Sequence, residues 1–183
     1  NAARFAEMNE CRPAADFDPA SVRAPVNRWI VGETARLRET VDEALSDYRF
    51  NDAASALYSD VWGVFCDWYV EFAKPLLLGE DDAAKAETRA CLAWALDRRL
   101  AMLHPFMPFV TEALWGQIAE RPNPLIVEDW PELSVSLGDP EADQRIRRLI
   151  GLIEAVRSVR AEMNVPPAAK LELLLTEGDA DLE

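Results

Sequence analysis

The chain has 183 residues, half of them hydrophobic and 28% charged, which suits one globular domain with a sizeable core. Its net charge of −14 counts against a free-standing nucleic-acid binder, because phosphate binding normally needs a basic surface that displaces counterions. The sequence has no apolar run near the roughly 18 residues of a membrane span and no secretory signal pattern, so we expect a cytoplasmic protein. Its three cysteines lack the spacing of a zinc site or a disulfide framework.

The first elements are predicted as helices from the spacing of their apolar residues. The run Asn1–Met8 resembles the interior of a helix, which predicts that the chain is a fragment. A long amphipathic helix is predicted over Pro25–Tyr48, because proline suits a first helical turn. Asn51 or Asp52 is expected to cap a third helix that runs to about Leu77. Apolar residues cover more than one stripe of this third helix, so we expect it at the centre of the core.

Prolines separate the next elements of the chain. A fourth helix is predicted over about Asp82–Leu103, and it ends where His104–Pro108 places two prolines. A fifth helix follows over Pro108–Glu120, and Leu125–Pro131 is expected as an extended strip over the bundle. Short breakers between long amphipathic segments predict antiparallel neighbours.

The composition changes from Asp139 onward. A last helix is predicted to end at Pro166–Pro167, and Lys170–Thr176 is expected to form a strand. The outer face of this helix is basic and carries Arg145, Arg147, Arg148, Arg157 and Arg160. The predicted fold class is therefore mainly α. It is an antiparallel helical bundle over residues 1–137, with a small α/β tail of helix plus strand over residues 138–183.

No arrangement typical of a catalytic centre is visible in the sequence. The one histidine, His104, lies between a leucine and a proline at a helix end, which favours a structural role. The seven glycines form no nucleotide-binding loop. Cys66 is interpreted as a small core residue, and Trp62 and Trp68 as core rings at helical spacing. Trp29 has two interpretations, packing inward or stacking on a base.

Several runs, in order over about Asn1–Pro131, resemble one family. These runs are Asn1–Phe5, Asn27–Ile30, Tyr48–Ala54, Phe65–Glu71 with Lys74, and Leu103–Trp115. Together they are similar to the anticodon-binding domain of valyl-tRNA synthetases, which are class I aminoacyl-tRNA synthetases. The isoleucyl enzymes share the bundle and are the first alternative. The second is a non-catalytic helical domain that docks another protein.

The resemblance implies a rigid helical scaffold that reads the anticodon bases of valine tRNA. The parent would be a monomeric ligase that attaches valine to this tRNA and binds ATP and magnesium in its catalytic domain. This chain lacks the ATP signatures of class I enzymes, so we expect it to be non-catalytic and to hold no cofactor or metal. Its acidity fits this role if the parent supplies most phosphate contacts.

The resemblance also implies which residues touch tRNA. In the related methionyl enzyme the corresponding helix offers an asparagine and an arginine to the anticodon, and Asn1 and Arg4 form a similar pattern. Phe5 and Trp29 are expected to stack on bases, and Lys74 to meet backbone phosphate.

Two of the basic features keep a second interpretation. Arg4 can instead form a surface ion pair with Glu7, three residues along the helix. The arginine-rich face of the last helix can touch tRNA backbone or remain a solvated surface.

Overall fold

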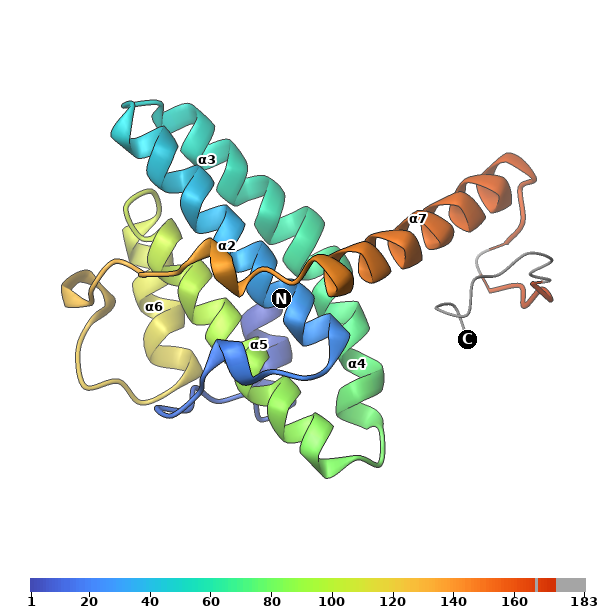
Figure 1. The fold of residues 1–183 in the computed structure, drawn as a ribbon, viewed down its shortest axis with the longest axis horizontal. Coiled ribbons are helices and arrows are strands. Elements are labelled where there is room, and N and C mark those ends of the chain that lie inside the picture. Colours follow the sequence, from blue (N-terminus) through green and yellow to red (C-terminus); the bar gives the residue numbers. More distant parts are fainter. Residues whose placement is uncertain (167, 174–183) are drawn as a thin grey trace.

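Helices form all the regular secondary structure in the described part of the chain (Figure 1). The computed structural model describes residues 1–166 and 168–173. Its helices are α1 (Ala2–Met8), α2 (Pro25–Ser46), α3 (Phe50–Ser59), the π-helix η2 (Asp60–Tyr69), α4 (Val70–Leu78), α5 (Asp82–Leu103), α6 (Pro108–Ile118) and α7 (Pro140–Glu162), with short 3-10 turns η1 (Pro19–Ser21), η3 (Leu125–Val127) and η4 (Val135–Leu137). α2 packs against α3, α5 and α7, and α5 packs also against α4 and α6, which confirms the predicted bundle. No helix among these described residues is long and apolar enough to cross a membrane.

Side-chain caps start two of the long helices where the sequence places them. The carboxylate of Asp81 accepts hydrogen bonds from two backbone N–H groups at the start of α5. Asp139 does the same at the start of α7. Both caps satisfy N–H groups that have no partner inside the helix. The fourth helix has the predicted bounds, and the fifth begins at Pro108 as predicted.

The turn between α2 and α3 differs from the predicted one in the residue at which the next helix begins. Tyr48 takes a φ of 57°, the left-handed region in which side chains are uncommon. Because the chain turns there, α3 already begins at Phe50, and Asn51 and Asp52 lie inside its first turn. The predicted cap at Asn51 or Asp52 is therefore wrong. Asp52 instead pairs with the guanidinium of Arg49 at 2.8 Å.

The core is centred on α2 and α5. These helices contribute the largest share of the buried side chains, and α2 also packs against α3 and α7. The predicted third helix exists as a continuous helical segment over residues 50–78, but part of its apolar surface faces solvent. The expectation that it forms the centre of the core is therefore wrong.

The strip after α6 lies across the bundle, as expected, and is held by polar contacts. The carboxylate of Glu112 accepts hydrogen bonds from the backbone N–H groups of Leu125 and Ile126. Further along, the indole N–H of Trp130 donates to Asp42 at 2.8 Å. The strip includes the 3-10 turn η3, so it is extended only in part.

The last helix, α7, docks onto the bundle by its first turns and then extends away from it (Figure 1). Ile146 is buried in the main core, and Asp143 pairs with Arg36 at 2.7 Å. α7 ends at Glu162, before the prolines that were expected to end it. Residues 170–173 form no strand, so that part of the strand prediction is wrong. The rest of the predicted strand, 174–176, lies outside the described residues.

The docking of α7 should depend on pH through Asp143. Burial acts to raise the pKa of this carboxyl, but the hydrogen bond from Arg147 and the charge of Arg36 outweigh burial and lower the pKa below the ordinary 3.8. A lowered pKa gives stability that is present above the ordinary value and is lost as the pH falls through the folded-state pKa. We therefore expect Asp143→Asn to be less stable than wild type at neutral pH, and this difference to shrink below pH 3.8.

Urea unfolding of both proteins between about pH 7 and pH 2 measures the difference in unfolding free energy. The control is Glu141→Gln, because Glu141 is an exposed acid of the same turn. A difference between wild type and Asp143→Asn that stays constant at the lowest pH would contradict the role of this carboxylate.

Candidate nucleic-acid interface

A groove with a volume of about 570 Å³ opens between α1 and the middle of the 50–78 helical segment. Its floor is apolar, because Phe65, Leu96 and Leu100 are buried there, and α6 adds Leu114. The polar and aromatic side chains that line it come from α1, η2 and α4. We call it the α1 groove and define it by Asn1, Phe5, Trp62, Asp67, Glu71 and Lys74.

Three of the five residues predicted to contact tRNA line the α1 groove. Asn1 precedes α1, and its side chain makes no capping hydrogen bond, so its amide is open to a ligand. Phe5 is half-buried and packs against the core. Lys74 lies in α4 and forms an ion pair with Glu71, one turn earlier. Residues from distant parts of the sequence therefore meet at one site.

Arg4 is exposed on α1 but is not among the residues that line the groove. Among the described residues it has no ion-pair partner, so the alternative pairing with Glu7 is not formed. Its five guanidinium N–H donors are therefore free to bind a base edge or a phosphate.

Trp29 does not belong to the interface. Its side chain is 3% exposed, and its indole N–H donates to Glu33 at 3.0 Å. Its ring meets that of Phe72 edge to face, with centroids 6.4 Å apart. The stacking role expected for Trp29 is therefore contradicted by burial, and inward packing is the correct interpretation.

The π-helix η2 supplies groove residues that the sequence interpretation missed. Trp62 was expected in the core but is 52% exposed and lines the α1 groove. A π-helix hydrogen-bonds five residues along instead of four, so positions that would share one face of an α-helix separate. Accordingly, Asp60 and Phe65 are both buried at a spacing of five, while Trp62 turns outward. Most π-helices are single turns inside α-helices, often at functional sites, whereas this one extends over ten residues.

A buried ion pair fixes η2 beneath the groove. Arg99 of α5 donates through Nε and Nη2 to the two carboxylate oxygens of Asp60, at 2.7 and 3.0 Å. Its Nη1 donates to the Thr34 hydroxyl at 2.9 Å, and the guanidinium lies 4.5 Å from the centre of the Phe65 ring. Burial raises the pKa of Asp60, and the charge of Arg99 opposes that rise. Because Asp60 is the first residue of η2, the pair ties the register of the π-helix to α5.

The histidine and the cysteines of this chain lie in settings typical of structural residues. The imidazole Nδ1 of His104 lies 2.8 Å from the Thr111 hydroxyl across the turn between α5 and α6, which supports the structural role predicted for it. Burial raises the pKa of the Cys11 thiol to about 11 and that of Cys91 to about 12. Burial also raises the pKa of Cys66, which is half-buried at the groove. These thiols are protonated at neutral pH and are poor nucleophiles.

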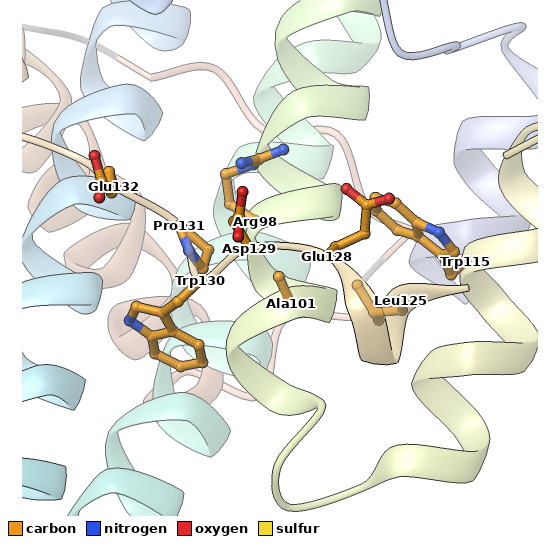
Figure 2. A pocket seen from close by; sticks show the side chains of 9 residues that line it. All are labelled: Arg98, Ala101, Trp115, Leu125, Glu128, Asp129, Trp130, Pro131 and Glu132. Atoms are coloured by element: carbon orange, nitrogen blue, oxygen red, sulfur yellow. The ribbon is translucent and has the colours of Figure 1, made fainter. Parts of the chain in front are cut away.

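A second cavity, of about 560 Å³, lies under the strip that follows α6. Figure 2 shows this strip passing across α5, with Arg98 rising from the helix and Glu128 on the strip. Asp129 and Glu132 add two further carboxylates to the lining. Three acidic groups against one arginine repel phosphate, so this cavity is a poor site for nucleic acid.

The α1 groove has a different balance of charge and ring surface. Its ionisable lining residues are Asp67, Glu71, Lys74 and Arg99, and both cations are already paired, Lys74 with Glu71 and Arg99 with Asp60, so no net positive charge gathers there. Apolar rings and polar side chains with both donors and acceptors are the groups that bind unpaired bases in RNA loops. The groove is thus better suited to bases than to the phosphate backbone.

Comparison with known families agrees with this geometry. Residues 27–175 match the family model described as the anticodon-binding domain of tRNA ligase. This chain belongs to that family. The match runs from the first turn of α2 through α7, so it includes the groove-lining helices η2, α4, α5 and α6 but not α1.

Valine–tRNA ligases are similar to this anticodon-binding domain over nearly its full length. The ligase of Ruegeria pomeroyi is 53% identical over 184 residues, which is 98% of this chain and 18% of the relative. The ligase of Caulobacter vibrioides is 54% identical over 93% of this chain and 19% of its own length. That of Brucella suis is 50% identical over 92% and 19%. The chain therefore spans less than a fifth of the length of these relatives.

Proposed function

We propose that this anticodon-binding domain reads the anticodon of valine tRNA as part of a valine–tRNA ligase. The observation that carries the proposal is the α1 groove, where Asn1, Phe5 and Lys74 come together although they are up to 73 positions apart in the sequence (74 − 1). Similarity to valine–tRNA ligases over almost the whole chain supports the choice of valine tRNA.

Each residue at the groove has a proposed role. The amide of Asn1 and the guanidinium of Arg4 hydrogen-bond to base edges, because neither side chain has a partner among the residues that the structure describes. Phe5 offers part of its ring to a base. Lys74 approaches a phosphate at the rim and exchanges its ion pair with Glu71 for that contact. A wrong anticodon then covers these polar groups without pairing them, which lowers its affinity.

The remaining functions of the ligase are proposed to lie elsewhere in a longer chain. ATP and magnesium do not fit the described residues, which contain no cluster of His, Cys, Asp or Glu placed to hold a metal and no glycine-rich phosphate loop. We propose that a catalytic domain of the same chain binds them, and that the ligase is a cytoplasmic monomer. Residues 138–183 would form an appended unit whose helix α7 is anchored by its first turns.

Anticodon-dependent binding tests this function. The dissociation constant of valine tRNA is measured for a full-length ligase that carries this domain, and again after one anticodon base is replaced. Loss of a base contact worth about 1–3 kcal/mol should weaken binding about 5- to 150-fold at fixed salt concentration. Replacing a base pair in the acceptor stem is the control for general damage to the tRNA.

Two results would redirect the proposal. Equal affinity for right and wrong anticodons would leave a helical domain that docks another protein as the better function. Preference for isoleucine tRNA over valine tRNA would move the domain to the isoleucyl branch.

A further inference from the structure

Two exposed aromatic side chains stand one turn apart beside the α1 groove. Tyr58 of α3 is 67% exposed, and Trp62 of η2 is 52% exposed. Their ring centroids are 6.5 Å apart and the ring planes are inclined by 54°. Large rings gain stability mainly by leaving water, so a neighbouring pair kept at the surface points to a partner that covers it.

The surroundings of Trp62 leave room for such a partner. A methyl group added at Gly63, the next residue along η2, would meet no atom within 4 Å outside its chain neighbours, so the helix surface at Gly63 is open. Trp62 itself lines the same groove as Asn1 and Phe5. A planar ring stacked on Trp62 would therefore lie next to a ligand bound in the groove.

The acidity of the domain favours a base over any other part of an RNA. With a net charge of −14, the domain cannot attract phosphate across its whole surface. Stacking needs no positive charge, since every base has a π-face that an aromatic ring can cover. A surface that binds RNA through stacking is compatible with an acidic protein.

We propose that Trp62, supported by Tyr58, is a stacking platform for one unpaired base of the anticodon loop, beside the bases held in the α1 groove. The inference rests on the proposed function and names a contact that function does not require. The π-helix is the cause of the arrangement, because its wider turn directs Trp62 out of the core while Phe65 stays buried.

The experiment uses a full-length ligase that carries this domain and the isolated anticodon stem-loop of valine tRNA as the probe. Trp62→Leu keeps an apolar side chain but removes the stacking face, and Trp62→Phe keeps a smaller face. We expect Trp62→Leu to weaken binding roughly 5- to 150-fold and Trp62→Phe to lose much less. The matched control is the double variant Tyr48→Ala with Phe50→Ala, which removes another exposed aromatic pair at the far end of α3.

Abasic replacements in the loop identify the stacked base. Each unpaired nucleotide is made abasic in turn, and the ratio of affinities between wild type and Trp62→Leu is measured. At one position this ratio should fall to one, because the base that stacks is already missing. Quenching of tryptophan fluorescence on RNA binding should also be larger for wild type than for Trp62→Phe.

Three results would overturn the platform. Binding of Trp62→Leu could equal that of wild type, or its defect could persist with every abasic loop. A lowered unfolding temperature of Trp62→Leu with unchanged RNA affinity would show instead that the ring packs against the rest of the ligase. Failure of the proposed function is distinct, since the wild-type ligase would then bind right and wrong anticodon loops equally.

Discussion

Replacing Arg99 with methionine is expected to destabilise the domain by about 3–5 kcal/mol. The change leaves the Asp60 carboxylate buried without the two hydrogen bonds that it accepts from Arg99 at 2.7 and 3.0 Å. It also removes the donor to Thr34. Burial already raises the pKa of Asp60, so the carboxyl of the variant should take up a proton, and this limits the loss. Urea unfolding at neutral pH measures the free energy of unfolding.

Two further variants decide whether the lost pair is the cause. In the double variant Asp60→Leu with Arg99→Met both charges are replaced by apolar groups, so most of the lost stability should return. Arg89→Met breaks an exposed ion pair with Glu10, 3.2 Å apart, and should cost about 0–1 kcal/mol. An Arg99→Met variant as stable as Arg89→Met would contradict the importance of the buried pair.

Replacing Arg4 with alanine is expected to lower kcat/KM for charging valine tRNA about 5- to 150-fold in a full-length ligase that carries this domain, which corresponds to about 1–3 kcal/mol. Activation of valine without tRNA should be unchanged. Arg4 is exposed and has no ion-pair partner among the described residues, so its loss should not alter the unfolding free energy. Arg4→Lys should recover only part of the activity, because an ammonium lacks the planar pair of donors.

The effect of Arg4 should depend on the anticodon. If the guanidinium binds a base edge, the defect shrinks on a tRNA whose anticodon is already mutated, because that contact is no longer made. Arg23→Ala is the control, since Arg23 is an exposed arginine before α2 and, unlike Arg4, lies on no groove-lining helix. Equal losses on tRNAs with right and wrong anticodons would assign Arg4 to a phosphate contact.

The sequence predicted those parts of the fold that depend on local signals. The bounds of α5 and the first residues of α2 and α6 follow from apolar spacing, an aspartate cap and the helix-starting prolines. The reversal at Tyr48 was missed, because a left-handed residue that is not glycine, asparagine or aspartate gives no compositional signal.

The candidate site was predicted in part, and the errors in that prediction share one cause. The resemblance supplied Asn1, Phe5 and Lys74, which the fold brings together, but exposure depends on contacts between distant segments. Trp29 and Trp62 both lie at helical spacing among apolar residues, yet the first is buried and the second is half-exposed. No property of their immediate neighbours separates them, because the difference arises from the π-helix and from the packing of α2 against α5.

The π-helix also determines how α3 and α4 are phased relative to each other. A π-helix rotates the chain by less per residue than the roughly 100° of an α-helix, so one residue removed between Asp60 and Tyr69 would change the phase of one flank against the other. Lys74 could then no longer reach the α1 groove while Leu57 and Ala53 kept their places in the core. The length of this stretch is therefore constrained as well as its composition, and deletion of Gly63, whose side-chain position is open, should do more harm than its replacement by alanine.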